Sequence, residues 1–147
     1  MVCENKAVLW IGAVSDAIDE EQLRAHGITT LVCVARGLLK VSPCPLNAHR
    51  GSHRYALLSL VDSPEETLFT PILEELFRFL DEALRTGGEI LVFCVKGQSR
   101  SVAVVAAYLM RRFGMSRSEA LGVIYSARKQ AQVSLSFFAQ LGRESYS

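Results

Sequence analysis

The sequence predicts a single α/β domain with a central, mostly parallel, twisted sheet of about five strands flanked by helices. Short apolar runs alternate along the chain with segments of helical periodicity, a pattern typical of parallel sheets. The chain has 147 residues, of which 50% are hydrophobic and 21% charged. This is enough to fill one core but too short for a second domain of ordinary size. One domain is therefore expected over residues 1–147.

Four apolar runs have the length and composition of strands. The run Ile28–Ala35 is rich in β-branched residues, which favour strands. The run Ile90–Val95 is apolar on both faces, as expected for a strand covered by helices on each side. The four predicted strands are Ala7–Ile11, Ile28–Ala35, Tyr55–Val61 and Ile90–Val95.

The helices carry clearer start signals than the strands. Asp19 is an N-cap candidate, Thr70-Pro71 places a proline at the first helical position, and Ser116 with Glu119 forms a capping box. Apolar residues between positions 72 and 84 recur at helical spacing and are expected in the core. The predicted helices are Glu20–His26, Pro71 to the Gly87-Gly88 pair, Ser101–Phe113, a helix after Ser116, and a short helix around Phe137–Leu141.

Composition argues against several classes of function. The net charge of +1 gives no reason to expect a nucleic-acid partner. No apolar run approaches the roughly 20 residues that span a bilayer, and the first residues lack the features of a secretion signal. The cysteines are far apart and no histidine stands at ligand spacing from one, so a zinc site is not expected. Reduced thiols in the cytoplasm, the nucleus or both are the simplest interpretation.

The most informative stretch joins the fourth predicted strand to the helix after it. The apolar strand runs into Cys94, a turn with Gly97 follows, and Arg100 stands just before a helix that begins near Ser101. Backbone N–H groups of such a loop converge on an anion, and the same positive potential favours a thiolate at Cys94. Arg100 adds a planar fork of donors for two phosphate oxygens. A lone cysteine at a strand end is usually just a buried apolar residue, but this surrounding pattern favours nucleophilic attack on phosphorus.

A proton donor for the leaving oxygen is expected at Asp62. It follows the third predicted strand, and ligands of parallel sheets gather at the carboxyl ends of the strands. Glu65 and Glu66 lie close by and stay open as alternatives, and an aspartate before Ser-Pro also suits a turn. Ser101 is expected to hydrogen-bond the departing thiolate, and Ser99 to brace the loop.

The stretch Cys94–Ser101, C-x5-R-S, resembles the signature loop of cysteine-dependent protein tyrosine phosphatases, and its Gly-x-Ser-Arg-Ser form is similar to the dual-specificity subgroup. With no kinase-docking domain expected before the catalytic unit, the chain resembles the small, atypical members of that subgroup. Similar blocks run from Leu9–Gly12 to Gln140-Leu141, so the resemblance spans nearly the whole chain. It implies a phosphotyrosine protein phosphatase-like fold without cofactor or metal. By the same resemblance Cys94 would be the nucleophile, Arg100 the phosphate clamp, Asp62 the general acid and then base, and Ser101 the thiolate stabiliser. We call residues 94–101 the signature loop; its expected substrate-binding residues are Val95, Lys96, Gly97, Gln98, Ser99 and Arg100.

Three positions depart from the family pattern. The family usually has His just before the nucleophile, and this chain has Phe93, which implies lower basal activity or a shifted pH optimum. An Asn common at the end of the second strand is replaced within Leu31-Val-Cys33-Val, and the usual Pro-Asn before the last helix is Val133-Ser134. These two changes are expected to loosen the support of the signature loop.

The resemblance implies a protein phosphatase that hydrolyses phosphotyrosine and phosphoserine/phosphothreonine through a phosphocysteine intermediate, with phosphorylated proteins or peptides as partners. The chain has no obvious place for the recognition loop of phosphotyrosine-specific members. Val95 and Gln98 stand where phosphoinositide-selective relatives carry basic residues, which disfavours lipids, and the loop also lacks the residues of RNA 5′-end phosphatases. The alternative is a pseudophosphatase-like module that binds phosphorylated proteins with little turnover. Phe93 gives that alternative weight, whereas Cys94 and Arg100 favour the enzyme.

Two further expectations concern segments away from the signature loop. Residues 35–54 carry basic side chains and no acidic ones, and would attract anionic phosphopeptides if they fold near the signature loop. Cys33 is expected in the sheet and Cys44 in a loop. A regulatory disulfide between Cys94 and another cysteine stays open as an alternative to purely structural roles.

Overall fold

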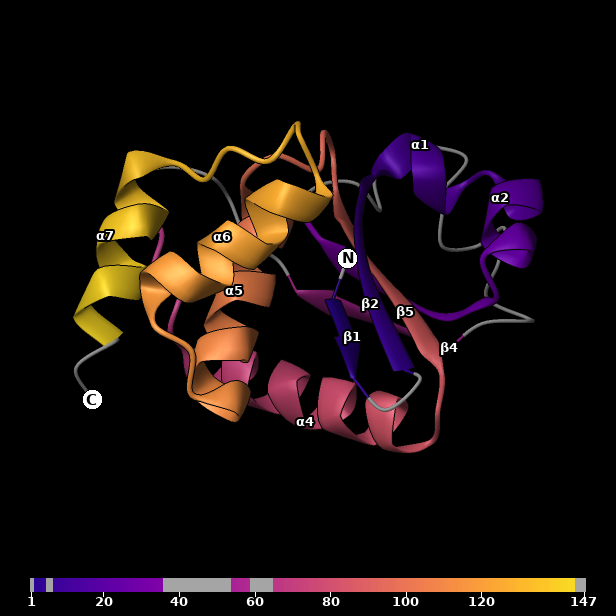
Figure 1. The fold of residues 1–147 in the computed structure, drawn as a ribbon, viewed down its shortest axis with the longest axis horizontal. Helices are drawn as coiled ribbons and strands as arrows, with labels where there is room; N and C mark the ends of the chain where they lie inside the picture. Colours follow the sequence, from indigo (N-terminus) through magenta and orange to yellow (C-terminus); the bar gives the residue numbers. More distant parts are fainter. Residues whose placement is uncertain (1, 5–6, 36–53, 59–64, 145–147) are drawn as a thin grey trace.

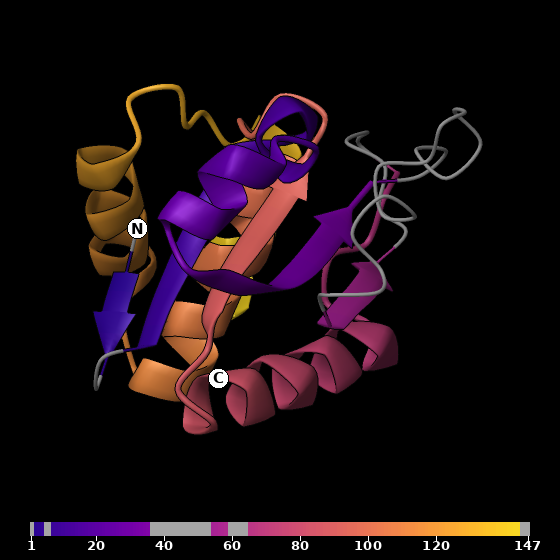
Figure 2. The ribbon, with the colours of Figure 1, turned by 90° about the vertical axis from the view of Figure 1, so that its right-hand side faces the viewer.

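The computed structural model describes residues 2–4, 7–35, 54–58 and 65–144. They form a five-stranded sheet in the order β1-β2-β5-β3-β4, with helices on both faces (Figures 1 and 2). The strands are β1 (Val2–Glu4), β2 (Ala7–Ala13), β3 (Ile28–Val34), β4 (Arg54–Leu58) and β5 (Glu89–Cys94). The helices are α1 (Val14–Ala17), α2 (Glu20–Ala25), α4 (Pro71–Arg85), α5 (Arg100–Phe113), α6 (Arg117–Ala127) and α7 (Leu135–Glu144).

The sheet confirms the predicted architecture. Strands β2, β5, β3 and β4 run parallel, and β1 pairs antiparallel with β2 at one edge. The sequence did not predict β1, because three residues carry too little periodicity. The predicted strand Tyr55–Val61 is found as β4, Arg54–Leu58, and positions 59–61 lie outside the described residues. The fourth predicted strand ends at Cys94, so Val95 already belongs to the signature loop.

Side chains of the central strands alternate between two apolar clusters, one on each face of the sheet. On β5, Ile90 and Val92 join the larger cluster under α4, α5, α6 and α7. Leu91 and Phe93 join the smaller cluster under α1 and α2. This two-sided burial explains why the run reads as continuously apolar in the sequence, and it places β5 at the centre of the molecule.

The capping signals at Asp19 and Ser116 are confirmed, whereas one core assignment was wrong and one helix was missed. Asp19 caps α2 by accepting the backbone N–H of Gln22 at 3.1 Å, and Ser116 caps α6 by accepting that of Glu119 at 3.1 Å. The expectation that the whole apolar stripe of α4 is core was wrong at Ile72, which is 58% exposed because it lies on the outer side of the first turn. Helix α1 was not predicted: it is a single turn opened by the Asp16 carboxylate, which accepts the backbone N–H of Ala13 at 2.8 Å.

This arrangement brings the ends of three strands together. The parallel strands β2, β5 and β3 all finish at the same edge of the sheet, with Ala13 paired to Cys94 in register. The signature loop leaves this edge from the central strand and enters α5, nine of whose residues are buried. Within the described ranges, no helix is long and apolar enough to cross a membrane.

Candidate active site

The signature loop forms a cup at the carboxyl edge of the sheet. Cys94 is the last residue of β5 and is 2% exposed, and α5 begins at Arg100. The loop between them encloses a cavity of about 180 Å³. Its lining includes five of the six predicted substrate-binding residues together with Cys94: Val95, Lys96, Gln98, Ser99 and Arg100. The sixth, Gly97, is buried and does not line the cavity.

Gly97 is required at its position by both conformation and space. Its φ is +67°, in the left-handed region that glycine adopts without strain. A Cβ atom there would lie 2.6 Å from the Gly12 carbonyl oxygen and 2.5 Å from Nη2 of Arg128. The loop therefore rests directly on the end of β2, and a larger residue would have to lift it.

Four consecutive carbonyl groups of the loop, from Val95 to Gln98, accept hydrogen bonds from residues outside the loop. Val14 donates its backbone N–H to the Val95 oxygen at 3.3 Å, and Gln132 donates to the Gln98 oxygen at 2.7 Å. Arg128 donates through Nε to the Gly97 oxygen at 2.8 Å and through Nη2 to the Lys96 oxygen at 3.4 Å.

The orientation of these carbonyl groups determines the orientation of the N–H groups of the loop. In a trans peptide the N–H lies opposite the C=O, so the N–H groups of residues 96–99 turn away from these contacts, toward the cup. Such a ring of N–H groups, with the N-terminus of α5 behind it, is suited to bind an anion with tetrahedrally arranged oxygens.

Ser99 and Ser101 have different partners. The Ser99 hydroxyl accepts the backbone N–H of Ser134 at 3.0 Å, which confirms that Ser99 braces the loop. The Ser101 side chain is fully buried, and its Oγ lies 3.2 Å from the Cys94 sulfur. The two serines of the motif therefore act on different parts of the site.

The surroundings of Cys94 favour the thiolate. Burial of the sulfur raises the pKa of the Cys94 thiol, but this is outweighed by hydrogen bonds from the side chain and backbone of Ser101, the backbone of Gly97, and the charge of Arg100. The resulting pKa lies below the ordinary value, so a larger fraction of the sulfur is ionised at neutral pH. An ionised sulfur is the nucleophilic form of cysteine.

Residues after α6 support the loop, and the sequence analysis missed their role. Arg128 follows the last residue of α6, where a basic side chain is ordinarily explained by the helix dipole. Nothing local in the sequence indicates that it reaches back 31 positions to the Gly97 carbonyl. The support from Ser134 runs through its backbone N–H, while its side chain accepts the N–H of Phe137 at 3.3 Å in the first turn of α7. The change at Val133-Ser134 thus leaves a backbone contact to the loop in place.

The two other departures from the family pattern are neighbours. Phe93 and Cys33 are register partners on β5 and β3, and their side chains are 0% and 1% exposed. Both belong to the apolar cluster beneath α1 and α2. The residue before Cys94 therefore packs in an apolar layer, and the groups that lower the pKa of Cys94 belong to the signature loop itself.

The predicted general acid cannot be placed in the site. Asp62 lies outside the described residues, as do Cys44 and the basic stretch 36–53. Of the two alternatives to Asp62, Glu65 is exposed and Glu66 accepts a hydrogen bond from Gln140 Nε2 through its backbone oxygen at 2.9 Å. Neither lines the cup.

Replacing Ser101 by alanine is expected to raise the pKa of Cys94, because the thiolate loses its hydroxyl donor. The rate of Cys94 alkylation by iodoacetamide can be followed across pH by mass spectrometry of the peptide that contains Cys94. The pH at which this rate increases should be higher for Ser101→Ala than for the parent. Ser99→Ala is the matched control, since that hydroxyl bonds Ser134. Identical profiles for the parent and Ser101→Ala would contradict this assignment.

Because Phe93 and Cys33 are neighbours, we expect substitutions at the two positions to have non-additive effects on the free energy of unfolding. Phe93→His alone places an imidazole in an apolar layer without a good partner and should lower the free energy of unfolding by about 1–3 kcal/mol. Adding Cys33→Asn supplies a side-chain partner, so the double variant should be more stable than the sum of the singles by about 0.5–3 kcal/mol. Urea unfolding of the four proteins measures this, and strict additivity would show that the two positions do not interact.

Comparison with known proteins agrees with this geometry. The family model described as the dual specificity phosphatase catalytic domain matches residues 9–145. The chain is 36% identical to dual specificity protein phosphatase 1B of Arabidopsis thaliana over 133 residues, which covers 90% of this chain and 75% of that protein. It is 37% identical to human dual specificity phosphatase 28, over 90% of this chain and 71% of that one.

Solved structures show the same likeness. The crystal structure of human DUSP28 superposes with a TM-score of 0.80 at 35% identity, covering 94% of this chain and 91% of that one. The human tyrosine phosphatase-like serine/threonine/tyrosine-interacting protein superposes with a TM-score of 0.76 at 28% identity, over 94% and 91% of the two chains. The resemblance carried by the signature loop is thereby confirmed over almost the whole chain, which belongs to the dual specificity phosphatase family.

Proposed function

We propose that this chain is a protein phosphatase that hydrolyses phosphotyrosine and phosphoserine/phosphothreonine through a phosphocysteine intermediate. Membership of the dual specificity phosphatase family supports a protein phosphatase with phosphorylated proteins as substrates. The observation that carries the finer proposal is the Cys94 sulfur, with its lowered pKa, beside a cup whose N–H groups turn inward.

In the first step the Cys94 thiolate attacks the phosphorus of the bound monoester. The S–P bond forms as the P–O bond to the substrate breaks, and Asp62 gives its proton to the leaving oxygen. Arg100 and the inward N–H groups of the signature loop bind the phosphoryl oxygens and stabilise the charge of the transition state. The products of this step are the free hydroxyl amino acid and phosphocysteine.

In the second step water hydrolyses phosphocysteine. The Asp62 carboxylate takes a proton from water as the water oxygen attacks phosphorus, and the S–P bond breaks. The leaving thiolate is stabilised by the Ser101 hydroxyl, whose oxygen lies 3.2 Å from the sulfur. Inorganic phosphate leaves, and Asp62 is again protonated for the next cycle.

Breadth toward the phosphorylated amino acid follows from the open rim of the cup. Val95, Lys96 and Gln98 line the cavity and are all exposed. A cup of about 180 Å³ with exposed lining residues admits the phosphoryl group of phosphoserine or phosphothreonine as well as that of phosphotyrosine. We propose action on cytoplasmic or nuclear phosphoproteins without nucleic-acid or membrane partners.

A second candidate is a binding module for phosphorylated proteins with little turnover. Two observations favour it: the apolar Phe93 directly before Cys94, and the similarity to the human serine/threonine/tyrosine-interacting protein, whose structure is described as tyrosine phosphatase-like. Against it stand Cys94, Arg100 and Ser101, all present, with Ser101 in contact with the Cys94 sulfur. The enzyme is the function these residues support best.

Hydrolysis of a small aryl phosphate across pH distinguishes the two functions. Cys94→Ser should abolish turnover, and Asp62→Asn should lower kcat by about 10²–10⁴-fold and flatten the alkaline limb of its pH profile. Glu65→Gln is the matched control and should change neither kcat nor the alkaline limb of the pH profile. A folded, reduced parent that binds a phosphopeptide without turnover would establish the binding module instead.

A further inference from the structure

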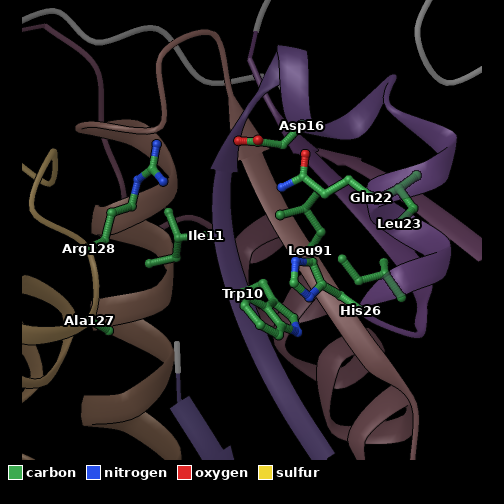
Figure 3. Close-up of a pocket in the computed structure, with 10 residues that line it drawn as sticks. Trp10, Ile11, Asp16, Gln22, Leu23, His26, Leu91, Ala127 and Arg128 are labelled. Atoms are coloured by element: carbon green, nitrogen blue, oxygen red, sulfur yellow. The ribbon is translucent and has the colours of Figure 1, made fainter.

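A second cavity, separate from the cup, lies along the edge of β2, with α1 and α2 on one side of this strand and the end of α6 on the other (Figure 3). Its volume is about 210 Å³, and it shares no lining residue with the cup. Strands β2 and β5 form its floor, α1 and α2 form one wall, and the end of α6 closes the other side with Ala127 and Arg128. Nothing in the proposed reaction uses this cavity.

Part of its lining is aromatic and flat. The rings of Trp10 and His26 are 4.6 Å apart between centroids with 33° between their planes. The indole is held in place by its N–H, which donates to Glu89 Oε1 at 3.1 Å. Buried aliphatic side chains of Leu23, Ile28 and Leu91 complete this part of the lining. Such a surface favours a planar apolar ligand, since rings gain more by stacking than flexible chains do.

The rest of the lining is polar and mixed in character. Asp16 presents carboxylate oxygens that only accept, Arg128 presents N–H groups that only donate, and the Gln22 amide does both. Figure 3 shows Asp16 and Gln22 on one side of β2 and Arg128 on the other. A ligand that carries both a donor and an acceptor satisfies this set, whereas a purely anionic ligand would face Asp16.

The size of the cavity limits the ligand further. Drug-sized ligands occupy pockets of about 300–1,000 Å³, so this cavity takes something smaller. We infer that it is a second ligand site, which binds a small planar nitrogen heterocycle with an exocyclic amino group, of the nucleobase type, and that it is coupled to the signature loop. The rings stack on Trp10 and His26, the amino group donates to Asp16, and a ring nitrogen accepts from Arg128 or Gln22.

The coupling runs through two walls of the cavity. Arg128 lines the cavity and also holds the carbonyl groups of Gly97 and Lys96. Asp16 lines it and also accepts the N–H of Ala13, next to Val14, whose own N–H holds the Val95 carbonyl. A ligand that binds these two side chains therefore alters the contacts that orient the cup. By linkage, a change in the loop alters the affinity of the cavity by the same factor.

Binding can be tested with adenine by ligand-observed NMR titration of the full chain, and purine, which lacks the amino group, is the matched probe. Purine should bind at least about tenfold more weakly, because the Asp16 acceptor loses its donor. His26→Ala should weaken adenine binding, whereas Arg24→Ala, also exposed on α2 but outside the cavity, should not. No adenine binding up to its solubility, or equal binding by both variants, would overturn the site.

The coupling can be measured without turnover, so a negative result for the coupling can be distinguished from a failure of the proposed function. Saturating adenine should change the alkylation rate of Cys94 by iodoacetamide by about fivefold, and the change should be lost in His26→Ala. An unchanged rate in a parent that demonstrably binds adenine would overturn the coupling.

Discussion

The arrangement of the site depends on hydrogen bonds that residues outside the signature loop donate to the carbonyl groups of the loop. Four consecutive carbonyl groups, from Val95 to Gln98, accept donors from α1, from Arg128 and from Gln132. These donors come from segments before and after the loop in the chain, so the shape of the loop depends on contacts that are distant in sequence. The sheet fixes Cys94, the glycine contact seats the loop on β2, and the orientation of the N–H groups follows. The orientation of these N–H groups is thus a property of the fold as much as of the motif.

The groups that lower the pKa of Cys94 all follow it in the chain. On the side of the loop, Ser101, Gly97 and Arg100 lower the pKa of the thiol against the effect of burial. The residue on the other side is Phe93, which packs with Cys33 in an apolar cluster that helps to stabilise the fold. The thiolate therefore depends on contacts within residues 94–101, and on the braces that keep those residues in place.

The fold and the centre of the site were predictable because their signals are local. The apolar run of β5, the caps of α2 and α6 and the strand–loop–helix around Cys94 are each readable within a few residues. What escaped prediction is non-local or very short. Arg128 acts across 31 positions, β1 has three residues, and α1 is one turn opened by Asp16. Ile72 was misassigned because periodicity alone does not tell which side of the first turn of α4 meets the core. Asp62 lies outside the described residues, so its role stays a prediction from the sequence.

The most direct test of the account is to trap the covalent intermediate. The protein would be mixed rapidly with an excess of aryl phosphate, quenched in acid and digested, and the peptide that contains Cys94 examined by mass spectrometry. The account predicts one phosphoryl group on Cys94, formed within the first turnover and absent from Cys94→Ser. Turnover of the substrate with no phosphoryl group on Cys94, or with one on another residue, would contradict it.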